Sequence, residues 1–223
     1  MMTRRRVGAV LWTLGVALLP LQMLVALQWP GGYSLTRNAM SDLGVTVCGL
    51  FADGDALIRN VCSPWHAVFN AGLIATGAST AMGAALLYGW WNGVSGRVGV
   101  LLVGVSGLFV MAVGIAPWDV LPDLHDAAAL AQAITQWCAM LLLATAAGTG
   151  WFRLLTLATI ALSIASFGAF LSALEGAEVS FLPFGVAERL AFDTLTVWTA
   201  ATGIVVLRSA SITRDRRSLS PAR

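Results

Sequence analysis

Charge is the first property that this sequence has little of. Only 11% of its 223 residues are charged, whereas 58% are hydrophobic, and the mean hydropathy is +0.80. A soluble domain of this size could not cover its surface with so few polar side chains, so the composition excludes an ordinary soluble protein and favours a membrane protein. Lysine is absent and the net charge is only +2, which gives no reason to expect a nucleic-acid partner.

Residues that commonly bind metals are also scarce. The chain has two histidines and three cysteines, and none has the spacing of a zinc motif, so we predict no metal site and disfavour zinc as a cofactor. Neither a Gly-x-Ser-x-Gly elbow nor another serine–histidine–acid pattern stands out, which leaves serine-triad catalysis without support at this level.

Long apolar stretches are what the sequence does contain. A helix needs roughly 20 residues to cross about 30 Å of hydrocarbon, and six stretches are long enough. They are expected at residues 7–27, 64–90, 98–116, 124–147, 152–174 and 186–207. Ser63 and Asp123 are expected to cap the second and fourth helices, and Gly148 and Gly150 to end the fourth. The predicted fold is an all-α, polytopic bundle of six transmembrane helices.

The N-terminus has some features of a signal peptide. Three arginines, Arg4 to Arg6, precede the first apolar run, but that run is too long and no small-x-small cleavage site follows it. We therefore expect a retained first helix. Residues 1–208 are expected to form one domain with an outward loop at 29–62, followed by a short, basic, disordered tail at 209–223 near anionic lipid.

Arginine positions predict the orientation. Ten arginines fall on the side that holds both termini, and three, Arg37, Arg59 and Arg189, fall on the other. By the positive-inside rule both termini face the cytoplasm, so the histidines and most acidic residues face outward. Cys48 and Cys62 then lie in an oxidising compartment and are candidates for a disulfide, with two unrelated thiols as the alternative. Cys138 lies within a helix and is expected to pack there.

Four segments together resemble a bacterial membrane family catalogued as domain of unknown function 998. They are Tyr33-Ser34 with Asn38 to Gly44, Ser63-Pro64 with Phe69-Asn70, Gly114 to Pro117 with His125, and Gly185 with Glu188-Arg189 and Trp198. The resemblance implies six helices and a bacterial inner membrane, and it implies no settled activity. Membrane hydrolases of the ceramidase and adiponectin-receptor type are a more distant comparison. They use three histidines around zinc, whereas this chain has two and lacks their paired-histidine helix.

Polar residues recur at helical spacing inside three of the spans. His66 and Asn70 share one helix face, His125, Gln132 and Gln136 share another, and Arg189 and Asp193 are four apart and can pair. Such stripes must face protein or a water-filled cavity, because amides facing lipid would stay unpaired. Asp193 lies well inside its apolar run and is the acid most expected to be buried.

Each of these polar groups also has a structural interpretation. Glu188, Arg189 and Asp193 could form an ion-pair cluster with Arg37 or Asp42. Asn38, Ser41 and Asp42 could cap a turn, Asp123 and Asp126 could complement a helix dipole, and the glutamines could join helices. The tryptophans could mark the membrane interface.

Convergence of these groups on one side favours a functional pocket. Its candidate catalytic residues are Asp42, His66, His125, Glu188 and Asp193. Its candidate substrate-binding residues are Asn38, Asn70, Gln132, Gln136, Arg189, Trp65 and Trp118. The leading hypothesis is a membrane enzyme that acts on a lipid or isoprenoid by carboxylate acid–base chemistry, such as proton-initiated cyclisation or lipid hydrolysis. The alternatives are a structural, regulatory or lipid-binding protein and, less favoured, a small-solute transporter. The sequence predicts no oligomeric state.

Overall fold

The computed structural model describes residues 4–52, 58–147, 150–176 and 182–218, with side chains described up to residue 209. The first span is α1 (Arg4–Leu14), the 3-10 turn η1 (Gly15–Ala17) and α2 (Leu18–Ala26). A second 3-10 turn, η2 (Ser41–Gly44), and two short strands, β1 (Gly49–Phe51) and β2 (Arg59–Val61), follow it. The remaining helices are α3 (His66–Leu87), α4 (Gly93–Ile115), α5 (Pro122–Ala146), α6 (Trp151–Leu174) and α7 (Phe184–Ser218).

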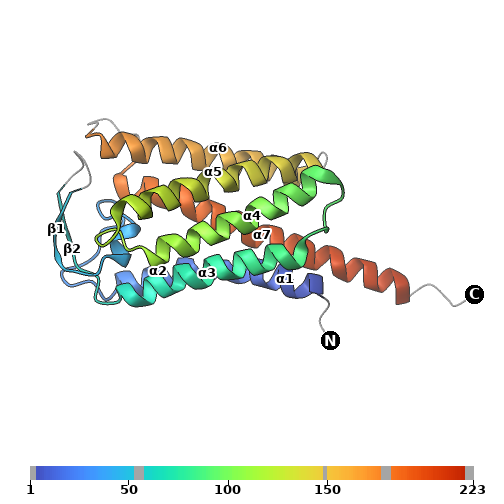
Figure 1. Cartoon of the computed structure of the whole chain (residues 1–223), viewed down its shortest axis with the longest axis horizontal. Helices are drawn as coiled ribbons and strands as arrows, with labels where there is room; N and C mark the ends of the chain where they lie inside the picture. The colour runs from blue at the N-terminus through green and yellow to red at the C-terminus, as the bar shows by residue number, and fades with distance from the viewer. Residues whose placement is uncertain (1–3, 53–57, 148–149, 177–181, 219–223) are drawn as a thin grey trace, which may run out of the picture.

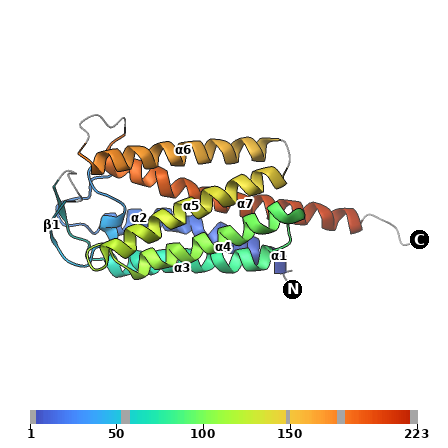
Figure 2. The same ribbon diagram turned by 45° about the horizontal axis from the view of Figure 1, so that its top comes forward.

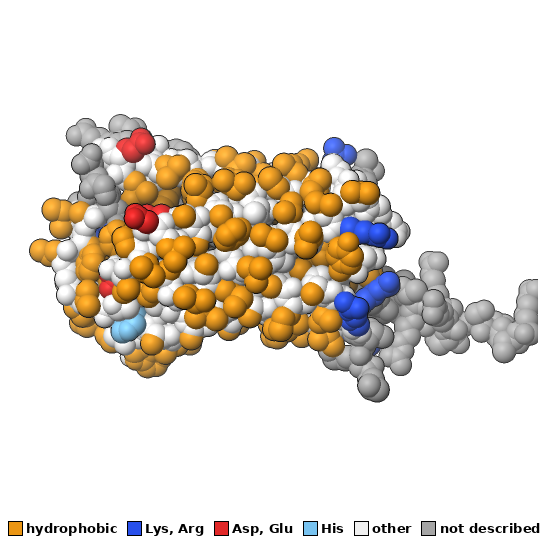
Figure 3. Space-filling model, viewed as in Figure 1, with side chains coloured by type: hydrophobic (Ala, Val, Ile, Leu, Met, Phe, Trp, Pro, Cys, Tyr) orange, Lys and Arg blue, Asp and Glu red, His pale blue; other side chains and the backbone are white. Residues whose placement is uncertain are grey.

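The six spans form an elongated bundle. Six helical segments are long and apolar enough to cross a membrane, which confirms the predicted all-α class and makes this a multi-pass membrane protein. Both termini lie at one end of the bundle, and β1, β2 and η2 lie at the other, which we call the hairpin end (Figures 1 and 2). Apolar side chains cover the flank between the two ends, while arginine gathers at the termini end and acidic side chains at the hairpin end (Figure 3).

Close backbone approach holds α3 against α4. A Cβ added at Gly107 would lie 2.7 Å from the carbonyl oxygen of Gly77, so only glycine permits this crossing. Helices in lipid gain little from the hydrophobic effect, and contact between small residues supplies dispersion energy instead. Trp12 of α1 adds a buried hydrogen bond from its indole N–H to the Thr80 carbonyl, at 3.0 Å.

Several element boundaries differ from the expectation. The loop after the first span contains an antiparallel β-hairpin, in which Gly49 pairs with Val61 and Phe51 with Arg59. α3 begins at His66 rather than at Pro64, and the Ser63 hydroxyl bonds to the Leu43 carbonyl instead of capping the helix. α5 is preceded by Leu121 as its N-cap residue, and Asp123 lies in the first turn. Gly148, the expected helix end, lies outside the described residues.

The last helix is longer than expected. α7 continues to Ser218, so the first part of the tail that was expected to be disordered is helical. No proline or glycine occurs between Gly203 and Pro221, so nothing in this stretch breaks the helix. The last five residues lie outside the described part.

Candidate active site at the hairpin end of the bundle

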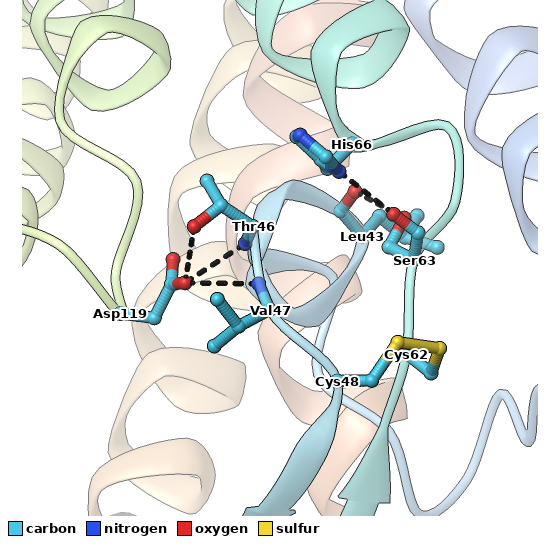
Figure 4. The surroundings of a disulfide bond; sticks show 8 residues. All are labelled: Leu43, Thr46, Val47, Cys48, Cys62, Ser63, His66 and Asp119. Atoms are coloured by element: carbon cyan, nitrogen blue, oxygen red, sulfur yellow. Dashed lines mark hydrogen bonds between the residues drawn. A yellow bond between two sulfur atoms is a disulfide. The ribbon is translucent and has the colours of Figure 1, made fainter.

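A disulfide closes the hairpin, and one carboxylate fastens it to the bundle. Cys48, just before β1, and Cys62, just after β2, are joined by a disulfide (Figure 4). Asp119, between α4 and α5, accepts hydrogen bonds through Oδ2 from the Thr46 backbone N–H at 2.9 Å and the Thr46 hydroxyl at 2.7 Å. The hairpin is therefore tied both to itself and to the α4–α5 connection.

Asp42 is a structural anchor in this arrangement. Its carboxylate is 1% exposed and receives Arg59 in a two-point contact, Nε to Oδ2 at 2.7 Å and Nη2 to Oδ1 at 2.6 Å. The Ala39 backbone N–H and the Asn38 side-chain amide also donate to Oδ2, at 2.9 and 3.2 Å. Four donors already occupy this buried carboxylate, so the expected catalytic role of Asp42 finds no support in its contacts.

Arg189 and Asn38 join the start of α7 to the first loop. Arg189 Nη1 donates to the carbonyls of Asn38 and Gly185, at 3.1 and 2.8 Å, and its Nη2 donates to the Tyr33 hydroxyl. The Tyr33 hydroxyl in turn bonds to the Ala39 carbonyl at 2.6 Å. The Arg189 guanidinium also lies 5.2 Å from the Tyr33 ring centroid. Arg189 is thus engaged by the loop and does not form the expected pair with Asp193.

Glu188 holds η2 from the α7 side. Its Oε2 accepts the Met40 backbone N–H and its Oε1 accepts the Ser41 backbone N–H at 3.2 Å. The exposed N–H groups at the start of a helical turn favour a carboxylate, which explains the contact. The contact places Ser41 and Glu188 next to each other, although they are 147 residues apart in the chain.

His125 in the first turn of α5 is held by its backbone surroundings. Its Nδ1 lies 2.8 Å from the Ala116 carbonyl oxygen, which can only accept, so the neutral ring carries its proton on Nδ1. Nε2 then has a free lone pair. His125 is 8% exposed and lines two cavities that lie side by side.

The deeper cavity reaches into the bundle between α2, α3, α4, α5 and α7. Its volume is about 50 Å³, enough for a few water molecules, and Asp193 and Gln132 line it. Asp193 Oδ1 accepts a 2.7 Å hydrogen bond from Gln22 of α2, and Gln22 Oε1 is buried without a partner among the described residues. Gln132 is 8% exposed, and its side-chain amide makes no hydrogen bond within that same part of the chain.

The second cavity is a lateral groove of about 500 Å³ between α5, α6 and α7. Phe167, Phe170 and Phe192 form much of its apolar wall, and Trp118 lies near its hairpin end. Its lining includes Leu130 and Leu171, which are exposed on the membrane-facing surfaces of α5 and α6. The groove therefore opens sideways, where hydrocarbon would surround the helices. Ser41, His125 and Glu188 are the polar side chains that line both cavities.

Other predicted site residues lie away from these two cavities. His66 bonds through Nδ1 to the Ser63 carbonyl at 2.9 Å (Figure 4), and Asn70 donates to the Gly44 carbonyl at 2.9 Å. Gln136 accepts from Ser106 at 2.5 Å and donates to Thr199 at 2.8 Å, so it joins α4, α5 and α7. Trp65 precedes α3 with its side chain 44% exposed, as suits an interfacial tryptophan.

Two polar residues of the site were missed from the sequence. Gln22 lies in the first apolar run and is fully buried beside Asp193, and an amide in such a run is itself a signal of an internal partner. Ser41 gave only the pattern of a capping residue. Its position in the lining of the same two cavities as His125 depends on how a loop packs against the bundle, which no local pattern reveals.

The described residues contain no group of three or more histidine, cysteine or acidic side chains placed to hold a metal ion. Comparison with known proteins gives one match. The family described as "Protein of unknown function (DUF998)" matches residues 13–205, from the first span to the last. Among curated proteins and among solved structures, none matches this chain. The matched region contains every residue of the two cavities, and the chain belongs to the DUF998 family.

Proposed function

We propose that this protein is an enzyme that performs acid–base chemistry on a lipid or isoprenoid substrate, which enters sideways from the bilayer. The observation that carries the proposal is that His125 and Glu188 line both the lateral groove and the deeper cavity. A chain in the groove would bring a reacting group to the junction of the two cavities. An apolar pocket with a few convergent polar side chains is the usual location of an active site.

His125 is the proposed general base. Its Nδ1–H is committed to the Ala116 carbonyl, which orients the ring and leaves the Nε2 lone pair to accept a proton. Asp193 and Gln132, in the deeper cavity, are the proposed groups that hold water or the polar part of the substrate. Asp42, Asn38 and Arg189 are assigned to the scaffold, because their hydrogen bonds go to the loop and to each other.

The charge of the lining favours a substrate without a negative charge at the reacting end. Asp126 and Glu188 line the groove and Asp193 lines the deeper cavity, whereas no arginine is among the described residues that line either cavity. Arg59 and Arg189, the two buried arginines nearby, are bound to Asp42 and to Tyr33. A phosphate or carboxylate placed at the junction would find no arginine among the described lining residues to pair with, and burying an unpaired charge is costly.

The two histidines offer a matched test, because each bonds through Nδ1 to a backbone carbonyl. Asparagine can keep that N–H donor while removing Nε2. We expect His125→Asn to stay folded and to lose the lipid product, and His66→Asn to retain both. The measurement is a mass-spectrometric comparison of membrane lipids from cells that make wild-type protein, either variant or none.

Two results would refute the catalytic proposal. One is a folded His125→Asn protein with wild-type lipids. The other is an unchanged lipid profile when the protein is missing, which would favour the rival structural role that the satisfied contacts of Asp42, Asn38 and Gln136 support.

We also propose a bacterial inner membrane with both termini in the cytoplasm. The excess of arginine at the termini end and the disulfide at the hairpin end support this orientation. A fluorescent reporter that folds only in the cytoplasm should be bright when fused after Arg223. A phosphatase reporter that is active only outside it should be inactive there, and the reverse result would overturn the orientation.

A further inference from the structure

We propose that Ser41 is a catalytic nucleophile that works with His125, so that the reaction is the hydrolysis of an acyl ester lipid. This inference rests on the proposed function and names its reaction. The cavities share three polar side chains, a hydroxyl, an imidazole and a carboxylate, from Ser41, His125 and Glu188. They come from three separate elements, η2, α5 and α7.

Ser41 has the chemical freedom that a nucleophile needs. Its backbone N–H is bound by Glu188, whereas its hydroxyl makes no hydrogen bond within the described part of the chain. The hydroxyls of two other residues of the first loop are engaged: Ser63 donates to the Leu43 carbonyl and Thr46 donates to Asp119. Ser41 lines the groove and the deeper cavity, so it can meet a chain-bearing ester from one side and water from the other.

His125 has the matching role of base. A nucleophilic serine needs a base in the correct tautomer and a third group that orients that base. The Ala116 carbonyl is that third group, because it fixes the proton on Nδ1 and frees Nε2. Glu188 is a positioning residue, because its carboxylate binds the backbone N–H groups of Met40 and Ser41 and so sets where η2 begins.

The reaction balances with water as the only co-reactant. Ser41 Oγ attacks the ester carbonyl carbon while His125 Nε2 accepts the hydroxyl proton. The bond from that carbon to the alkoxy oxygen then breaks, and His125 returns the proton to the departing alcohol. Water, for which the deeper cavity has room, attacks the acyl-serine and gives its proton to His125. The bond from the acyl carbon to Ser41 Oγ then breaks, His125 returns the proton to Oγ, and the fatty acid leaves.

A long-chain alkyl fluorophosphonate tests the nucleophile without knowledge of the natural substrate. This neutral probe forms a phosphorus–oxygen bond to an activated serine and releases fluoride. We expect one equivalent of label on the full-length protein in detergent, with peptide mass mapping placing it on Ser41. Mapping on the wild-type protein identifies the residue even if a variant fails to fold.

Three variants complete the test. Ser41→Ala should abolish labelling, His125→Asn should slow it by 100-fold or more, and the control His66→Asn should label at the wild-type rate. Absence of label on wild-type protein, label on another residue, or equal rates for the two histidine variants would overturn the inference. If labelling fails while His125→Asn still loses the lipid product, the nucleophile is wrong and the proposed acid–base function stands.

Discussion

The Arg59 guanidinium donates two hydrogen bonds to the Asp42 carboxylate, with nitrogen–oxygen distances of 2.6 and 2.7 Å. Arg59 belongs to β2, three residues before the disulfide cysteine Cys62, and Asp42 belongs to η2. The pair therefore transmits the position of the disulfide-closed hairpin to the 3-10 turn that presents Ser41. Asp42, which anchors the turn, and Ser41, which is proposed to react, are thus neighbours in sequence with separate roles.

Breaking this pair should destabilise the protein strongly. Arg59→Met leaves the Asp42 carboxylate buried without its main counter-charge, which costs about 3–5 kcal/mol in other proteins. We expect a large fall in the thermal unfolding temperature in detergent. Arg37→Met is the control, because Arg37 is exposed in the same loop, and it should change the free energy of unfolding by less than about 0.5 kcal/mol. Equal melting of the two variants would contradict the anchoring role.

The disulfide should contribute measurably to stability. It closes a loop with a sequence separation of 14, for which the loss of chain entropy in the unfolded state predicts about 3 kcal/mol. Cys48→Ser with Cys62→Ser should lower the unfolding temperature and abolish its dependence on reductant. Cys138→Ser, at the exposed free cysteine, should leave that dependence intact. A wild-type protein whose melting ignores reductant would refute this prediction.

Gln132 and Gln136 lie one helical turn apart on α5, and replacing each should affect a different property of the protein. Gln136→Leu removes bonds to Ser106 and Thr199 and should reduce stability by about 1–2 kcal/mol, since such bonds in membranes have modest strength. Gln132→Leu removes a cavity-lining amide that has no hydrogen-bond partner among the described residues, so it should leave stability nearly unchanged and reduce the lipid product. Unfolding curves and lipid mass spectrometry of both variants would check the contrast. The same change in both measurements for both variants would contradict it.

Stability should fall at high pH because of Tyr33. Burial raises the pKa of the Tyr33 hydroxyl above its ordinary value of 10.0, against the opposing effect of the Arg189 guanidinium. The unfolded chain then loses this proton at a lower pH than the folded protein does. The contribution is therefore present below about pH 10 and is lost as the pH rises through the folded pKa.

Unfolding measured from pH 8 to 11 would check that slope. In a Tyr88→Phe background Tyr33 is the one tyrosine left, so absorbance follows its hydroxyl alone. Adding Tyr33→Phe to that background should flatten the slope. An identical pH dependence with and without the Tyr33 hydroxyl would contradict the assignment.

Part of the site could be predicted because it obeys helical periodicity. His125, Gln132 and Gln136 share a face of one helix, and all three are buried, as amides in a membrane span must be. Their spacing did not show which side chain hydrogen-bonds to neighbouring helices and which faces a cavity. Gln136 meets partners on α4 and α7, whereas Gln132 meets a cavity, and that difference depends on the helices opposite.

The loop residues illustrate the opposite case. The segment from Asn38 to Gly44 carried the family resemblance, and its acid, Asp42, was the obvious catalytic candidate. In the structure Asp42 is occupied by Arg59, while the neighbouring Ser41 lines both cavities. A shift of one residue along a 3-10 turn changes the direction of a side chain, so only the packed loop distinguishes the anchor from the candidate nucleophile.

Composition and hydrophobic length alone determined that this chain crosses a membrane six times, because the cost of burying polar groups in hydrocarbon leaves a sequence few other choices. Arginine bias added a predicted orientation for the same electrostatic reason. The tertiary structure decided which polar groups neutralise one another and which face open space. That outcome depends on contacts between residues as far apart as Ser41 and Glu188, whose geometry arises from packing and has no local pattern to announce it.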